Sequence, residues 1–357
     1  MAADFQIDED IRAASTLPGR FYSDPAIFQA LRERVFAKSW QQIGDTARLA
    51  APGKVCPTSF LEGILDEPLL LTRDAGDRLH CVSNVCTHRG NIVCDAEGVE
   101  QALRCRYHGR RFALDGRFLS MPEFEEAKGF PSERDSLRAV ELGSFGKLLF
   151  AALAPAFPFA ELIAPLQARL GWVPFERAVF EPSRSRDYTV KANWALYCDN
   201  YLEGFHIPFV HAALNQAVDY AAYRTELFQW SSLQIGPGLD CFELPRSSPD
   251  HGQSIAGYYF FLFPNTMLNF YPWGISINRV MPLAPDRTRI RYLTWIWNRA
   301  RLGQGAGGDL DRVEREDEAV VESVQRGIGS RLYDRGRYSP SRETGVHHFH
   351  RLLARFL

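Results

Sequence analysis

Two short segments in the first third of the chain each contain one cysteine and one histidine. They are Cys86-Thr-His88-Arg-Gly and Cys105-Arg-Tyr-His108-Gly. Residues 89–104 between them are long enough for a strand, a turn and a strand, so the two segments can face each other. A zinc site could also use two Cys and two His, but zinc sites usually pair Cys with Cys and His with His. The mixed pairs fit a [2Fe-2S] cluster, with both thiolates on one iron and both imidazoles on the other.

This pattern resembles the Rieske centre. The resemblance makes Cys86, His88, Cys105 and His108 the cluster ligands. High-potential Rieske proteins have a further Cys in each loop, and here the matching places hold Asn91 and Tyr107. The sequence therefore resembles the low-potential, oxygenase-type branch of the family. It departs from that branch at Arg110-Arg111, where many oxygenases have Trp after the His-Gly.

Length and composition narrow the class of protein further. A chain of 357 residues with 46% hydrophobic residues is long enough for about two domains with packed cores. A net charge of −2 gives no field that would attract nucleic acid or a membrane, so neither is expected as a partner. Seven cysteines, two of them assigned to the cluster, indicate a reducing compartment. The first ten residues lack the pattern of a signal peptide, and we expect a cytoplasmic protein.

The periodicity of the chain divides it into three parts. Asp24 can cap a helix that begins at Pro25, so residues 1–40 are expected to form a helical segment packing on the catalytic domain. Short apolar runs over 41–155 predict a small antiparallel β domain with the cluster at two hairpin tips. Residues 156–357 contain strands, with helices predicted near 193–206 and 309–328. The predicted fold class is α+β, an all-β cluster domain plus an antiparallel sheet with helices on one face.

His206 and His211 are the first candidates for a second metal site. Five residues along a continuous helix leave two side chains about 140° apart, which is too far to meet on one ion. Pro208 removes a backbone donor between them, and we expect it to bend the helix so that the two imidazoles converge. A chance pair of histidines at a helix end is the alternative interpretation.

A third, anionic ligand is expected from the helix near 309–328. Two histidines and one carboxylate form the facial triad of non-haem Fe(II) oxygenases. Asp317 lies at the centre of an apolar stripe of this helix, whereas Glu318 lies about 100° further round. A carboxylate on the core-facing side needs a cation nearby, so Asp317 is the predicted ligand and Glu318 the substitute. The other acids are expected on a solvated face. They are Asp309, Asp311, Glu314, Glu316 and Glu322.

The run Asn193-Trp-x4-Asp199-Asn200-x2-Glu203-x2-His206-x4-His211, with Glu-Asp about a hundred residues later, resembles the catalytic domain of Rieske non-haem iron oxygenase α subunits. The resemblance implies that His206, His211 and Asp317 bind a mononuclear Fe(II), and that Asp199 and Asn200 belong to the site. It also implies that Glu203 links this iron to His108 of a neighbouring subunit in a head-to-tail homotrimer. Glu at that position resembles the branch that oxidises quaternary ammonium compounds, such as choline and carnitine monooxygenases.

The activity implied is that of a terminal oxygenase. Electrons would come from a separate NAD(P)H-dependent reductase of flavin or ferredoxin type, and O2 would be activated to hydroxylate a C-H bond of a quaternary or methylated amine. Aromatic-ring dioxygenation or O-demethylation is the alternative within the class, and a Rieske electron carrier is the alternative outside it. An aromatic cluster that could form a cationic cage or plain sheet core comprises Tyr258, Tyr259, Phe261, Phe263, Phe270, Tyr271 and Trp273. Gly303–Gly308 matches a nucleotide loop, but the acids that follow it favour a connector.

Overall fold

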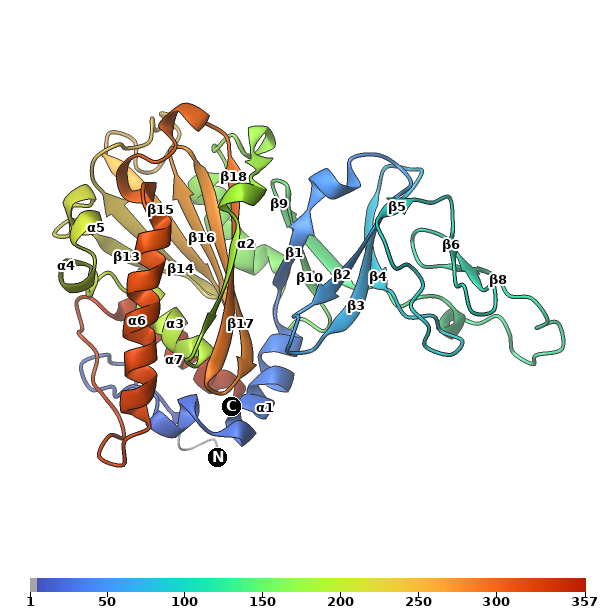
Figure 1. Ribbon diagram of the computed structural model, residues 1–357, viewed down its shortest axis with the longest axis horizontal. Coiled ribbons are helices and arrows are strands. Elements are labelled where there is room, and N and C mark those ends of the chain that lie inside the picture. The colour runs from blue at the N-terminus through green and yellow to red at the C-terminus, as the bar shows by residue number, and fades with distance from the viewer. Residues whose placement is uncertain (1–4) are drawn as a thin grey trace. The chain divides into compact units, whose positions relative to one another are not determined.

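The computed structural model describes residues 5–357, so the first four residues of the expected N-terminal segment lie outside it. The chain forms two compact units, whose segments can be followed in Figure 1 by the colour scale of residue number. The small unit is Ala37–Ala156, and the large unit joins the N-terminal segment up to Phe36 with Phe157–Leu357. No helix among the described residues is long and apolar enough to cross a membrane.

The small unit is built of antiparallel strands in three sheets. One sheet has the order β1-β10-β9, the second β4-β3-β2-β5, and the third β6-β7-β8. Their bounds are β1 Gln41–Asp45, β2 Lys54–Phe60, β3 Glu67–Arg73, β4 Leu79–Ser83, β5 Gly98–Val99, β6 Leu103–Arg104, β7 Arg111–Phe112, β8 Phe118–Ser120, β9 Glu141–Phe145 and β10 Leu148–Ala152. The second and third sheets flank the two Cys/His segments, which lie between β4 and β5 and between β6 and β7.

The large unit is organised around one antiparallel sheet. Its strands follow the order β11-β18-β17-β16-β15-β14-β13, and β12 also pairs with β18. Their bounds are β11 Val179–Phe180, β12 Arg186–Val190, β13 Arg224–Leu227, β14 Ser231–Pro237, β15 Ile255–Leu262, β16 Thr266–Tyr271, β17 Gly274–Ala284 and β18 Arg287–Ile296. Successive hairpins set the register, and β17 with β18 forms the longest pair. This sheet with its helices is the α+β organisation predicted from the sequence.

The helices of the large unit pack mainly against this sheet and each other. They are α1 Pro25–Arg34, α2 Phe159–Leu170, α3 Trp194–Tyr201, α4 Ile207–Val210, α5 Ala212–Ala217, α6 Leu310–Ile328 and α7 Thr344–Phe356. Asp24 caps α1 and Pro25 opens it, as predicted, and Asp309 caps α6. Figure 1 shows α6 lying along the sheet, and α3 contacts α6, α7 and β17.

The register of the sheet places an unusual row of polar side chains on its buried, helix-covered face. Gln234 of β14 pairs with Tyr259 of β15, which pairs with Asn269 of β16. Asn278 of β17 pairs with Tyr292 of β18. Since side chains alternate between the faces of a strand, these residues share a face. All but Tyr259 are at least nine-tenths buried, and buried polar groups at this density indicate a functional cavity rather than a plain core.

Candidate metal centres

The two Cys/His segments of the small unit adopt the same turn. The amide of Gly90 donates to the carbonyl of Cys86 at 2.9 Å, and that of Gly109 donates to the carbonyl of Cys105 at 3.0 Å. Both glycines have positive φ, of 72° and 77°, which a residue with a side chain rarely adopts. The backbone therefore gives each loop one buried thiol and one partly buried imidazole in equivalent positions.

The four side chains of these loops fit a [2Fe-2S] cluster. The rings of His88 and His108 lie 4.7 Å apart, centroid to centroid. Cys86 and Cys105 are buried free thiols joined by a hydrogen bond, and burial raises the pKa of Cys86. Nδ1 of His88 is buried without a hydrogen-bond partner, as expected for an atom that coordinates a metal. Two thiols and two imidazoles arranged in this way match the Rieske ligand set.

Arg110 follows the second loop and is buried, with 2% of its side chain exposed. Its guanidinium pairs with the carboxylate of Asp135 and lies over the rings of Phe112, Phe118 and Phe130. Arg110 therefore occupies an aromatic pocket, where stacking and an ion pair offset its burial. This contact explains how the chain accommodates Arg where many oxygenases have Trp.

The mononuclear site begins where α3 ends. After Tyr201 the chain leaves the helix, and the single turn of α4 separates His206, its N-cap, from His211, which follows its last residue. The expected helix over 193–206 is therefore shorter, and Pro208 does not bend it. Pro208 lies instead in the first turn of α4, where a missing backbone donor costs nothing. The two imidazoles converge as predicted, but the cause is this one-turn helix and not a bend at Pro208.

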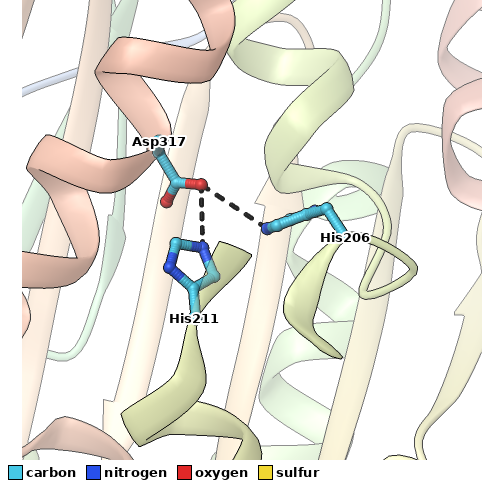
Figure 2. A group of neighbouring side chains, drawn as sticks. All are labelled: His206, His211 and Asp317. Carbon is cyan, nitrogen blue, oxygen red and sulfur yellow. Dashed lines mark hydrogen bonds and ion pairs between the residues drawn. The ribbon is translucent and has the colours of Figure 1, made fainter. Parts of the chain in front are cut away.

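Both histidines point at one oxygen of Asp317 on α6 (Figure 2). Nε2 of His211 lies 3.0 Å from Oδ1 of Asp317, and Nε2 of His206 lies 3.5 Å from the same atom. One ligand atom from each residue falls within 4.8 Å of the others, so one ion can meet all three. Glu318, the alternative predicted from the sequence, is not in this group.

A glutamate fixes the far nitrogen of each imidazole. Nδ1 of His206 lies 2.6 Å from Oε1 of Glu203, and Nδ1 of His211 lies 2.8 Å from Oε2 of Glu316. Histidines that bind metals usually hold a carboxylate or carbonyl with their other nitrogen, which orients the ring. Burial lowers the pKa of His211, but the contacts with Asp317 and Glu316 outweigh it and raise that pKa. Two histidines oriented in this way and one carboxylate fit a ferrous ion.

The prediction that Glu314 and Glu316 lie on a solvated face was wrong. Glu316 contacts His211, and Glu314 is buried with 9% of its surface exposed. Glu314 precedes Asp317 by three residues, so it lies on the same side of the helix. The three-residue spacing from Asp317 indicates which side of the helix Glu314 lies on. The sequence does not indicate that this side of the helix faces a cavity.

The other predicted site residues divide into two groups. Asn200 and Glu203 line the cavity beside the two histidines. Asp199 does not line it. Its carboxylate accepts from Tyr22 at 3.0 Å and contacts Nε2 of His350 on α7 at 2.9 Å. Asp199 therefore holds α3 against α7. The sequence did not predict this contact, because Asp199 and His350 are 151 positions apart in the chain.

The cavity at the mononuclear site has a volume of about 90 Å³ and is lined by tyrosines. They are Tyr197, Tyr201, Tyr223, Tyr259 and Tyr271. The rings of Tyr223 and Tyr259 lie 6.3 Å apart and nearly parallel, and Tyr271 meets Tyr259 edge-on at 5.9 Å. Of the aromatic cluster predicted from the sequence, only Tyr259 and Tyr271 line the cavity. Tyr258 and Phe270 precede them in their strands and face the other way, whereas Phe261 shares the face of Tyr259 but packs against Phe349 of α7.

The glycine-rich segment forms one wall of this cavity. Ala306, in the 3-10 turn Gly305–Gly307, is a lining residue. A Cβ at Gly307 would lie 2.4 Å from Nε1 of Trp273 and 2.8 Å from the ring of Tyr271, so only glycine fits there. The segment is a connector packed on aromatic side chains, consistent with the prediction.

Comparisons with known proteins agree with both centres. Residues 39–131 match the Rieske [2Fe-2S] domain, and residues 175–357 match the ring hydroxylating alpha subunit (catalytic domain). The chain belongs to the ring-hydroxylating α subunit family, the Rieske non-haem iron oxygenases. It is an oxygenase whose cofactors are a Rieske [2Fe-2S] cluster and a mononuclear iron, and a separate reductase supplies its electrons.

Three relatives span nearly the whole chain. The carnitine monooxygenase oxygenase subunit of Escherichia coli (strain K12) is 29% identical, over 99% of this chain and 98% of its own. The chloroplastic choline monooxygenase of Arabidopsis thaliana is 27% identical, over 99% of this chain and 85% of its own. A solved quaternary ammonium Rieske monooxygenase, described in connection with carnitine oxidation and inter-subunit electron transfer, superposes with a TM-score of 0.76 at 23% identity, over 100% and 97% of the chains.

Proposed function

We propose that this oxygenase hydroxylates a C-H bond of a quaternary or methylated amine. The observation that carries the proposal is the tyrosine-lined cavity that also contains the two histidines and Asp317. Faces of aromatic rings attract a quaternary ammonium group, and several rings around one space form a cage for it. The named activities of the choline and carnitine monooxygenases support the same substrate class.

The alternatives within the class are aromatic-ring dioxygenation and O-demethylation. The tyrosine rings around the cavity and the named activities of the choline and carnitine relatives favour amine oxidation over both.

We assign the site residues as predicted from the sequence. Cys86, His88, Cys105 and His108 hold the cluster, and His206, His211 and Asp317 hold the iron. When bound, the cluster delivers electrons one at a time, and the iron activates O2 next to the substrate. Asn200 contributes to the wall of the cavity. Glu203 orients His206 within the chain, which supports its place beside the iron.

Glu203 is also proposed to connect the iron to His108 of a neighbouring subunit in a homotrimer. A second hollow of about 230 Å³ shares Asn200, Glu203 and His206 with the first, so Glu203 borders both. Exposed apolar side chains beside it include Phe205, Phe209 and Val324, with 40%, 79% and 42% exposure. Large apolar side chains left exposed next to a site are typical of a protein interface. The electron donor is proposed to be an NAD(P)H-dependent reductase, and a cytoplasmic location stays a prediction.

Hydroxylation beside nitrogen consumes O2, two electrons and two protons for each N-methyl group that reacts. One oxygen atom enters a C-H bond of the methyl group, which becomes an N-hydroxymethyl group, and the other oxygen atom leaves as water. This carbinolamine then breaks its C-N bond, releasing the tertiary amine, formaldehyde and a proton. Hydroxylation at an alcohol carbon would give an aldehyde hydrate instead. In either reaction the chain's own residues hold the substrate and exclude bulk water.

A screen of O2 uptake tests the proposal. Choline, other methylated amines and small arenes are offered with a generic reductase, and product is identified by mass spectrometry. We expect amine-dependent uptake that His206→Ala abolishes while the visible absorption of the cluster survives. Uptake with arenes alone would contradict the proposal. Intact function in the His206→Ala protein would indicate the electron carrier instead.

A further inference from the structure

Glu314 on α6 is a buried acid that the proposed metal sites do not use. Its Oε2 accepts hydrogen bonds from the hydroxyls of Tyr197 and Tyr292, both at 2.6 Å. Its Oε1 has only the amide of Asn278, at 3.4 Å. Glu314 lines the tyrosine cavity, so the weakly bonded oxygen belongs to a group that faces the substrate space.

All of these partners are neutral. Within residues 5–357, no lysine or arginine forms an ion pair with Glu314. Burial and the charge of Asp317 raise the pKa of Glu314 to about 7, against the three hydrogen bonds. A buried carboxylate in such surroundings is stabilised in its charged form when a cation comes within a few ångströms.

An iron at the histidines would not balance the charge of Glu314. Asp317 and Glu203 supply two carboxylates there, which match the charge of one divalent ion, and Arg312 pairs with Glu316 at 2.9 Å. Glu314 is a further acid, placed one helical turn before Asp317. A cation that balances Glu314 would therefore enter the cavity with a ligand.

The cavity has no matching site for an anion. None of its described lining residues is a lysine or an arginine. Three of its four amide side chains donate within the protein. Gln234 donates to the carbonyl of Tyr201, Asn269 to Oδ1 of Asn278 at 3.1 Å, and Asn278 to Glu314 at 3.4 Å. A carboxylate on the substrate would meet Glu314 and Asp317 without a partner, and unpaired buried charge is costly.

We propose that Glu314, held by Tyr197 and Tyr292, is the counter-ion of the substrate's ammonium group, and that the enzyme selects small cationic amines that carry no carboxylate. This inference rests on the proposed function and narrows it. The position of Glu314 about one helical turn, or roughly 5 Å, from Asp317 places the charged nitrogen near the iron.

Binding to the holoenzyme tests the role of Glu314 without turnover. The probes are choline and its neutral isostere 3,3-dimethylbutan-1-ol, titrated anaerobically by calorimetry into wild type and Glu314→Gln. Gln keeps the size of the side chain and still accepts from both tyrosines. We expect wild type to prefer choline by about tenfold or more, and Glu314→Gln to reduce the preference to about threefold or less. Glu318→Gln, which removes an acid of the same helix outside the cavity, is the matched control and keeps the preference.

A second set of binding titrations uses only the wild-type protein, so it tests the inference even if the Glu314→Gln variant does not fold. Choline, the neutral isostere and the anion 3,3-dimethylbutanoate should bind in that order. The inference is overturned if a folded Glu314→Gln protein still prefers the cation, or if the wild type binds the anion more tightly than choline. In either case, amine-dependent O2 uptake would still support the proposed function. Absence of both amine-dependent uptake and cation preference would overturn the two together.

Discussion

Nδ1 of His211 lies 2.8 Å from the carboxylate of Glu316, while Nε2 of the same ring faces Asp317 at 3.0 Å. Two adjacent residues of α6 thus hold opposite edges of one imidazole. Removing the first should let the ring rotate away from the metal position. We expect Glu316→Ala to lower iron affinity by about 10–100-fold, the usual effect of losing such a partner. Iron retention against a ferrous chelator measures it.

Arg315→Gln provides the control for that variant. Its partner is Asp311, also on α6, and the side chains of both are more than half exposed. An exposed pair of this kind contributes about 0–1 kcal/mol. Equal iron loss in the Arg315→Gln and Glu316→Ala proteins would show that the helix, not the contact with His211, holds the iron.

Asp317 and Glu318 are adjacent acids with different surroundings. Asp317 meets both histidines, whereas burial raises the pKa of Glu318 to about 7 and its Oε1 has no hydrogen-bond partner. We expect Asp317→Asn to lose the mononuclear iron and Glu318→Gln to keep it, with the cluster's visible spectrum unchanged in both. Iron analysis distinguishes them, and loss of iron from the Glu318→Gln protein would reverse the assignment.

The ion pair between Arg110 and Asp135 should make the small unit sensitive to acid. Burial raises the pKa of Asp135, but hydrogen bonds from Ser132 and Arg110 outweigh it and hold that pKa below its usual range. A carboxyl with a lowered pKa in the folded state stabilises the fold above its unfolded pKa, about 3.9, and loses this contribution as the pH falls further. The midpoint temperature of thermal unfolding of the wild type should therefore fall steeply below about pH 4.

Asp135→Asn leaves the buried Arg110 without its counter-ion. We expect it to destabilise the fold by on the order of 2 kcal/mol at neutral pH, less than for a fully buried pair because Asp135 is 19% exposed. The midpoint temperature of unfolding should fall less with decreasing pH in this variant than in the wild type. If the two midpoints change in parallel from pH 3 to 7, the proposed role of the ion pair is contradicted.

Two glycines of the large unit should respond in opposite ways to alanine. Gly307→Ala places a Cβ against Trp273 and Tyr271, and we expect a loss of about 1–3 kcal/mol together with a weaker affinity for substrate. Gly327 lies in α6 with open space around its Cα, so Gly327→Ala should stabilise by about 0.5–1 kcal/mol. Thermal midpoints and apparent KM values check both, and a tolerated Gly307→Ala would mean that the cavity wall can move.

Local chemistry explains which features were predictable from the sequence. The cluster loops were recognised because Cys86, His88, Cys105 and His108 lie within two short segments whose spacing reports their ligand set. Asp317 was found because a carboxylate on an apolar stripe is exceptional. The roles of Glu314, Glu316 and His350 depend on contacts across more than twenty residues, with Tyr292, His211 and Asp199 respectively, and helical periodicity carries no information about such partners.

Cavity walls were harder to predict than ligands. Tyr258 and Tyr259 are neighbours in the sequence, yet only Tyr259 lines the cavity, because one residue of register reverses the face of a strand. Tyr197 and Tyr201 enter the cavity from α3 and were absent from the predicted aromatic cluster. A pattern of aromatic residues therefore indicates a sheet. Strand register and the packing of α3 determine which aromatic side chains line the cavity.

Iron and sulfide analysis of anaerobically purified wild type and His206→Ala protein tests the central claim that two iron centres share one chain. The wild type should contain about three iron atoms and two sulfides per chain, two irons in the cluster and one at the mononuclear site. His206→Ala should contain about two irons, with the cluster spectrum intact and amine-dependent O2 uptake lost. Zinc in place of iron, or an unchanged iron content in the variant, would contradict the account.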